Sequence, residues 1–234
     1  MKLGLFSDPH YCREDVLCGT RRPRLSLAKI GEALDAFRRE DVSLVVCMGD
    51  LTDRSASHEE AIVCLSELTA LIGKSGLPFR NVPGNHDYLD FTAEELSRAG
   101  LRTPPYTEVW DGVRLIVLDA NYRSSMRRFD LAGVEWTDSN LPPEQLCFLE
   151  TTLQMSAEPC VVLIHENLDP AAGEEHTVRN AEEARKIIAD SKKVSLVIQG
   201  HYHPGMEHEI GGIRYLTLPA MCEGEANRFR ILEI

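Results

Sequence analysis

Five short motifs hold most of the side chains in this sequence that could do chemistry. They are Asp8-Pro9-His10, Gly49-Asp50-Leu51-Thr52-Asp53-Arg54, Gly84-Asn85-His86-Asp87, the lone His165, and Gly200-His201-Tyr202-His203. Carboxylates, imidazoles and an amide oxygen together form a mixed oxygen and nitrogen donor set, which suits manganese, iron or zinc. The set contains no thiolate, which argues against a closed structural zinc site. Because it offers too many ligands for one ion, we expect two divalent or trivalent transition-metal ions that share a bridging carboxylate.

Each motif follows a short apolar run within one or two residues. The runs span residues 3–6, 44–48, 79–82, 160–164 and 194–198. Runs of this length and composition predict buried strands. In an open α/β sheet, ligands bind beyond the carboxyl ends of the strands. The five motifs should therefore converge in one crevice.

Longer stretches with helical spacing of apolar residues alternate with these strands. They span residues 26–39, 58–72, 92–98, 143–153 and 181–189. Such alternation is typical of an α/β protein. Towards the end, residues 206–210, 213–218 and 229–234 predict antiparallel strands, with a turn at Gly211-Gly212. A hairpin is also predicted around Asp111-Gly112.

Two irregular stretches, residues 119–142 and 166–180, are the longest in the chain. Loops of such length in a compact domain are often functional lids or substrate walls. The chain has no low-complexity segment or linker, and 234 residues suffice for one well-buried core. We therefore expect residues 1–234 to form a single domain.

The charge of the chain limits the partners it can attract. With 25 basic and 37 acidic side chains, its formal net charge is −12. So acidic a surface does not concentrate a polyanion, which makes nucleic acid an unfavoured partner. No apolar run approaches the ~18 residues that would span a membrane. The seven scattered cysteines and the lack of a signal peptide favour free thiols in the cytoplasm.

In this order, the five motifs resemble those of the calcineurin-like metallophosphoesterases, over residues 8–203. The resemblance implies a four-layer α/β/β/α sandwich with mixed sheets, whose second sheet would take the antiparallel strands at the end of the chain. It also implies the metal ligands. Asp8, His10 and His203 would hold one metal, Asn85, His165 and His201 the other, and Asp50 would bridge them.

The same resemblance implies a hydrolase that cleaves a phosphate mono- or diester. Two metal ions ~3.5–4 Å apart can bind a bridging hydroxide that attacks phosphorus, and can clamp the phosphoryl oxygens. His86 would donate a proton to the leaving oxygen, and Asp53 would orient His86. Arg54 would contact a phosphate oxygen beside Asn85 and His86.

Several of these residues also have purely structural interpretations. Asp50 could cap the helix that follows it, and Asp87 is better explained by turn formation than as a ligand. Arg54 could be a solvated surface arginine, and His165 a hydrogen-bonded core histidine. Outside the motifs, His58, His176 and His208 are interpreted as surface or loop residues, with a role near substrate left open for His176. Tyr202 is expected to pack outward.

Three other functions remain to be weighed against a small-molecule phosphoesterase. A nuclease of the same superfamily would need a basic groove, which the charge does not favour. A non-catalytic binding module would have lost ligands, and none is lost here. A protein Ser/Thr phosphatase is disfavoured, because the family's protein phosphatases carry GDxxDRG and GNHE. Here Ser55 follows Arg54 in place of that glycine, and Asp87 follows His86 in place of that glutamate. The closest likeness is to bacterial cyclic-nucleotide phosphodiesterases, but His165-Glu166-Asn167-Leu168 departs from their usual form, so the substrate stays open.

Overall fold

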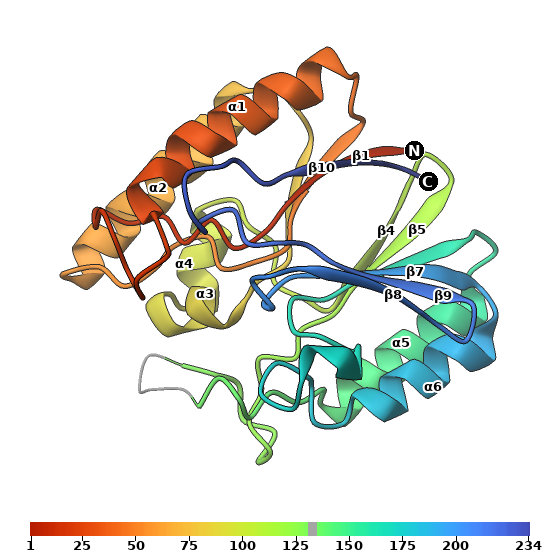
Figure 1. Cartoon of the computed structure of the whole chain (residues 1–234). Coiled ribbons are helices and arrows are strands. Elements are labelled where there is room, and N and C mark those ends of the chain that lie inside the picture. Colours follow the sequence, from red (N-terminus) through yellow and green to blue (C-terminus); the bar gives the residue numbers. More distant parts are fainter. Residues whose placement is uncertain (131–134) are drawn as a thin grey trace.

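Two β-sheets lie between two layers of helices in the computed structural model, which describes residues 1–130 and 135–234 (Figure 1). The first sheet has the strand order β10-β1-β2-β3. Its strands are β1 (Lys2–Phe6), β2 (Leu44–Cys47), β3 (Phe79–Asn81) and β10 (Arg230–Glu233). The first three run parallel, and β10 pairs antiparallel with β1.

The second sheet has six strands in the order β4-β5-β6-β7-β9-β8. They are β4 (Tyr106–Trp110), β5 (Val113–Val117), β6 (Cys160–Leu163), β7 (Val194–Gln199), β8 (Met206–Ile210) and β9 (Ile213–Thr217). The four inner strands are parallel, and the two edge strands, β4 and β8, are antiparallel to their neighbours.

The helices cover the outer faces of the two sheets (Figure 1). They are α1 (Ser26–Arg39) and α2 (His58–Lys74) on the first sheet, and α5 (Pro143–Met155) and α6 (Ala181–Ser191) on the second. Two short helices, α3 (Asn85–Asp90) and α4 (Ala93–Arg98), follow β3, and single 3-10 turns occupy Pro23–Leu25 and Pro170–Ala172.

Three hydrophobic cores separate these four layers. Alternate residues of each strand point to opposite faces, so Leu3 and Leu5 of β1 face the second sheet, whereas Phe6 packs against α1 and α2. The middle core joins them to Val161 and Leu163 of β6. The predicted four-layer α/β/β/α sandwich with mixed sheets is therefore confirmed.

The ends of the predicted elements show where local pattern and tertiary structure differ. Both predicted hairpin turns form, and Asp111 and Gly112 have the positive φ values (47° and 79°) that tight hairpins require. The last strand was expected in the second sheet, but β10 pairs with β1 in the first. Helix α3 was not expected. Within the described residues, 1–130 and 135–234, no helix is long and apolar enough to cross a bilayer.

Candidate metal centre

The loops that leave β1 and β2 continue side by side after the strands end. The backbone N–H of Asp8 donates to the carbonyl of Gly49 (3.0 Å), and that of His10 donates to the carbonyl of Asp50 (2.9 Å). Asp50 is not a helix cap, because Ser57 caps α2 by accepting from the amide of Glu60. The first two motifs are thus held together by main-chain bonds.

Four of the predicted ligands have a left-handed backbone. Their φ values are 50° for Asp8, 46° for His10, 53° for Asp50 and 65° for His201. This conformation is uncommon outside glycine and costs about 1 kcal/mol or more per residue. The surrounding hydrogen bonds hold these residues in it, and the sharp turns direct their side chains into one buried crevice.

The Asp50 carboxylate lies between imidazoles from different strands. Its Oδ2 is 3.4 Å from Nε2 of His10, which follows β1, and 3.4 Å from Nε2 of His165, which follows β6. Ligand atoms of Asp50, His165 and His201 all lie within 4.8 Å of one another, a spacing that could hold a metal ion.

The Asp8 carboxylate lies beside the same imidazoles. Its Oδ1 is 3.7 Å from Nε2 of His203, 3.9 Å from that of His10 and 4.0 Å from that of His165. Asn85 opens the short helix α3 and shares a hollow with Asp50. The structure therefore brings all seven predicted metal ligands to one place.

Several of these ligand atoms are buried without a hydrogen-bond partner among the residues described. They are Asp8 Oδ1, His10 Nε2, Asn85 Oδ1, His165 Nε2 and His201 Nε2. A buried polar atom left unpaired costs about 1–3 kcal/mol. Because oxygen and nitrogen lone pairs face a common space, bound cations would satisfy all of them, and the donor set fits transition-metal ions.

The charges at the centre also favour a cation. Burial opposes protonation of His165, but Asp50 and Asp8 outweigh it and raise the pKa of His165 well above its usual value. The negative charges of these carboxylates thus stabilise a positive charge at this place, either a proton or a metal ion. Burial lowers the pKa of His10 to about 4 and that of His201 well below 6.5, so both are neutral donors at pH 7.

Outer hydrogen bonds fix the orientation of the imidazoles. Nδ1 of His165 contacts the carbonyl oxygen of Met48 (2.5 Å), and Nδ1 of His203 contacts Glu223 Oε1 (2.7 Å). Such contacts set the tautomer of a ligand histidine and leave Nε2 free for metal. Asp87 accepts from the amides of Asp50, Leu51 and Gly84 at 2.8–3.0 Å, which agrees with its interpretation as a turn-forming residue.

Asp53 touches more groups than the sequence indicated. Its Oδ1 is 3.5 Å from Nδ1 of His86, the expected contact, but its Oδ2 is nearer to Nδ1 of His10, at 3.1 Å. Arg21 donates to the same Oδ2 at 2.7 Å. Burial opposes the charged form, yet the hydrogen bond from His10 and the imidazole charges hold the pKa of Asp53 far below its usual range. Asp53 therefore links a predicted metal ligand, His86 and a guanidinium.

A hollow of about 400 Å³ opens over the centre. It is lined by Arg21, Asp50, Asn85, His86, Trp136, His176, His201, Tyr202, His203 and Pro204. Tyr202 was expected to pack outward, but its ring meets His176 at a centroid distance of 5.2 Å inside this hollow. Arg54 instead lines a neighbouring hollow of about 430 Å³ together with Arg21, Asp53 and His86.

Sequence reasoning missed three residues beside the centre. Arg21 is the cation that lines both hollows, Glu223 holds His203, and the buried Cys222 thiol lies within 4.8 Å of the ligand atoms of His10 and His203. None of them belongs to a motif after a strand, so no local signal marked them. All seven cysteines are free, as expected.

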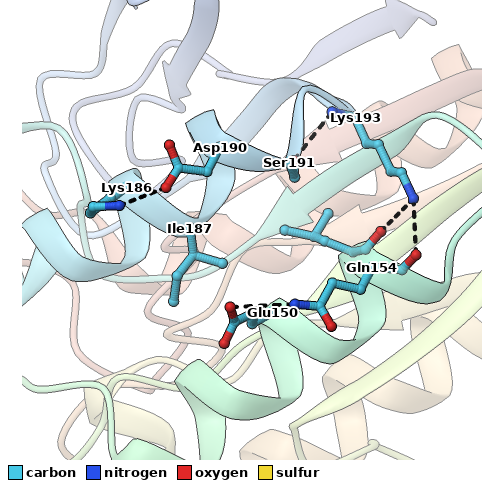
Figure 2. A pocket seen from close by; sticks show the side chains of 8 residues that line it. Glu150, Gln154, Lys186, Ile187, Asp190, Ser191 and Lys193 are labelled. Atoms are coloured by element: carbon cyan, nitrogen blue, oxygen red, sulfur yellow. Dashed lines mark hydrogen bonds and ion pairs between the residues drawn. The ribbon is translucent and has the colours of Figure 1, made fainter.

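Another hollow lies between α5 and α6 and shares no lining residue with the hollow over the centre (Figure 2). Its polar groups already have partners. Lys193 Nζ donates to the carbonyls of Leu153 (2.7 Å) and Ser156 (2.6 Å) at the end of α5, and Lys186 pairs with Asp190 (2.6 Å). This hollow joins two helices and offers no unpaired buried donor or acceptor among the residues described.

Residues 1–205 match the model of the calcineurin-like phosphoesterases. The chain therefore belongs to the calcineurin-like metallophosphoesterase family, whose members are metal-dependent phosphoester hydrolases. The resemblance seen in the five motifs is confirmed.

Its relatives include named cyclic-nucleotide enzymes. The chain is 24% identical to the 3′,5′-cyclic adenosine monophosphate phosphodiesterase CpdA of Haemophilus influenzae, over 95% of this chain and 77% of that protein. Identity to the Vibrio vulnificus protein of the same name is 30%, over 60% of this chain and 49% of that protein. Among solved structures, a dimetal phosphatase from Danio rerio superposes with a TM-score of 0.84 at 21% identity, covering 98% of this chain and 91% of that one. The last likeness concerns the fold.

Proposed function

We propose that this chain hydrolyses a phosphate mono- or diester of a small molecule at a pair of transition-metal ions. Asp8, His10 and His203 would hold one ion, Asn85, His165 and His201 the other, and Asp50 both. The observation that supports this most directly is the position of Asp50 Oδ2, 3.4 Å from His10 on one side and 3.4 Å from His165 on the other. A carboxylate that bridges two metal ions would lie between the imidazole ligands of the two ions, as Asp50 does here.

Metal ions bound there would supply a nucleophile by lowering the pKa of a water, and would polarise the phosphoryl oxygens. The chain's own residues do the rest. His86 lines the hollow with a partly exposed ring, so that it can give a proton to the leaving oxygen. Asp53 holds the Nδ1 side of both His86 and His10, which leaves each Nε2 directed away from it.

Arg21 and Arg54 divide the contacts to phosphate. Arg21 lines the hollow that contains Asp50 and Asn85, so a phosphate bound at the metal ions would lie near its guanidinium. Arg54 lies one hollow further out, beyond His86, where it can attract an anionic substrate but does not share the hollow of the ligands. A fork of N–H donors suits phosphate oxygens in either position.

The size and charge of the site favour a small substrate. A hollow of about 400 Å³ suits a nucleotide-sized molecule, and a net charge of −12 repels long polyanions. Because the relatives in Haemophilus and Vibrio are named as 3′,5′-cyclic adenosine monophosphate phosphodiesterases, cyclic nucleotides are the first diesters to test.

The test is a hydrolysis panel with added Mn²⁺. It should compare aryl phosphate monoesters, aryl phosphodiesters, and 2′,3′- and 3′,5′-cyclic nucleotides, with the Asp50→Asn variant as the control. We expect turnover that a chelator abolishes and that Asp50→Asn lacks. Tight binding and cleavage of DNA that weaken steeply with salt would favour the nuclease instead. A protein that binds no transition metal and cleaves none of these esters would be a binding module.

A further inference from the structure

Three aromatic side chains lie next to one another beside the candidate metal centre, in tilted and edge-to-face contacts. They are Trp136, His176 and Tyr202, here called the aromatic wall. The ring centroids of Trp136 and His176 are 5.3 Å apart, and those of His176 and Tyr202 are 5.2 Å apart. The His201 ring lies 5.5 Å from Trp136 and 5.4 Å from His176. One side of the wall therefore packs against a predicted metal ligand.

Two of the three rings of the wall come from the two long irregular stretches of the chain, and Tyr202 belongs to the fifth motif. Trp136 belongs to the first stretch and His176 to the second. Arg179 joins them, because its amide donates to the carbonyl of Ser139 (2.9 Å) and its side chain pairs with Asp138 (3.3 Å). Nearby, the Asn180 side chain both accepts from the amide of Leu141 and donates to its carbonyl, each at 2.9 Å. These bonds hold the two loops against each other.

A second set of bonds fixes the wall relative to the centre. The carbonyl of His176 accepts from the amide of Asn167 (3.2 Å). The Asn167 side chain is buried and donates to the carbonyl of Gly200 (3.0 Å), two residues before Tyr202. The rings are therefore arranged around the hollow by residues that follow β6 and β7, the same strands that position His165 and His201.

The indole of Trp136 remains 38% exposed although it lines a hollow of charged and polar groups. The chain's other tryptophan, Trp110 on β4, instead packs against the middle core and beside the Arg80 guanidinium, 5.5 Å from its ring centre. An indole, an imidazole and a phenol offer flat apolar faces and polar edges, which suits contact with another flat ring. A phosphoester whose phosphate sits among the ligands would place its organic group next to this wall.

We propose that the aromatic wall binds a flat aromatic ring, such as a nucleobase, in the organic part of the substrate. This inference rests on the proposed function and adds the residues that would select the substrate. A ring stacked there would be recognised through its face, so the wall favours nucleotides over sugar phosphates without distinguishing sharply between bases.

The first test compares inhibitors that share a phosphate and differ in the ring. Inhibition constants for AMP, ribose 5-phosphate and inorganic phosphate are measured against the Mn²⁺-loaded chain. Trp136→Ala should raise the constant for AMP about tenfold and leave those for ribose 5-phosphate and phosphate unchanged. Trp136→Phe should keep most of the affinity for AMP. The matched control, Trp110→Phe, should change none of the three.

The second test needs no turnover. In the Trp110→Phe variant, Trp136 is the only tryptophan, so its fluorescence reports on the wall alone. With the chain loaded with Zn²⁺, AMP should quench this emission and ribose 5-phosphate should not.

The outcomes separate this inference from the proposed function. If Trp136→Ala weakens the binding of AMP and ribose 5-phosphate by the same factor, or leaves the inhibition constant of AMP unchanged, the wall does not bind the ring. The inference then fails, while the proposed hydrolysis stands. If AMP alone quenches Trp136 but no phosphoester is cleaved, the wall is supported and the proposed function is wrong.

Discussion

Asp50 is the residue on which the two-metal assignment depends. Asp50→Asn removes the negative charge that faces both His10 and His165, so the binding of both metal ions should be weakened or lost together. We expect turnover to fall by about 100-fold or more, since even residues that only support a ligand are worth about 10–100-fold. Metal content by mass spectrometry measures the effect. Asp8→Asn is the comparison variant and should chiefly weaken the binding of one ion. Two ions retained in Asp50→Asn would contradict the assignment.

His86 tests the chemistry rather than the metal binding. With its ring in the hollow and Asp53 behind it at 3.5 Å, His86→Ala should slow esters with poor leaving groups by about 10²–10⁴-fold, the usual contribution of a general acid. Esters of p-nitrophenol, which leave without a proton, should be affected far less. The metal content should not change. His58→Ala, which alters an exposed histidine paired with Glu95, is the control.

At the scale of elements, Gly84 makes room for two predicted ligands, Asp50 and His165, where β3 passes into α3. A Cβ at Gly84 would overlap the Asp50 carboxylate and approach His165 Cε1 to 2.7 Å, although an L residue could adopt the backbone there. Gly84→Ala should therefore weaken metal binding about tenfold or more, the lower end seen when a ligand's support is lost. Binding is measured by calorimetric titration. Gly31→Ala in α1 is the matched control, because its added Cβ meets nothing within 4 Å.

Helix α4 offers a test of stability against pH that does not involve the centre. Thr92 and Glu95 form a capping box, in which Glu95 Oε2 accepts from the amide of Thr92 at 2.9 Å. That hydrogen bond, and to a smaller extent the hydrogen bond with His58, lowers the pKa of Glu95 from 4.5 to about 2. Between these values the unfolded chain binds more protons, so the contribution is complete above about pH 4.5 and is lost as the pH falls towards about 2.

The variant that tests this is Glu95→Ala. It should lower the free energy of unfolding by about 1 kcal/mol at pH 7, as the loss of a cap typically does. The difference from the unsubstituted chain should shrink as the pH falls below 4.5. Urea unfolding at neutral and acidic pH measures both quantities. A difference that stays constant down to acidic pH would show that Glu95 does not act as a charged cap.

At the scale of the whole molecule, the centre joins the two sheets. Asp8, Asp50 and Asn85 follow strands of the first sheet, and His165 and His201 follow strands of the second. Metal ions bound by both groups would stabilise the sandwich, because the unfolded chain has no such site. At a free concentration of about 100 Kd, one ion adds about 2.7 kcal/mol.

Thermal unfolding measures this stabilisation. For a chain of 234 residues, saturating Mn²⁺ should raise Tm by about 5–10 °C per ion, at about 2–4 °C per kcal/mol. A chelator should reverse the change. The Asp50→Asn variant should show little of it. An equal rise in Asp50→Asn would mean that the ions bind elsewhere.

Much of the site could be predicted because its parts are local in sequence. Each strand shows its own apolar run, and the motif that carries the donors begins one or two residues after that run. The motif of Asp50 begins directly after residue 48, and that of His201 begins two residues after residue 198. Strand ends in an α/β sheet meet at one edge. The donors of all five motifs were therefore named from the sequence, and the structure places them together. The extent of the domain, the metals and the cellular location stay predictions.

The residue types, their order and the strands before them were determined by the sequence alone, since periodicity and side-chain chemistry need no partner. Tertiary structure decided the rest. Loops without a period supply Arg21, Glu223, Trp136 and His176, which act at the centre only through contacts with residues far away along the chain. Likewise β10 pairs with β1 across more than two hundred residues. Which sheet such a strand joins depends on long-range packing, which no local pattern of apolar residues encodes.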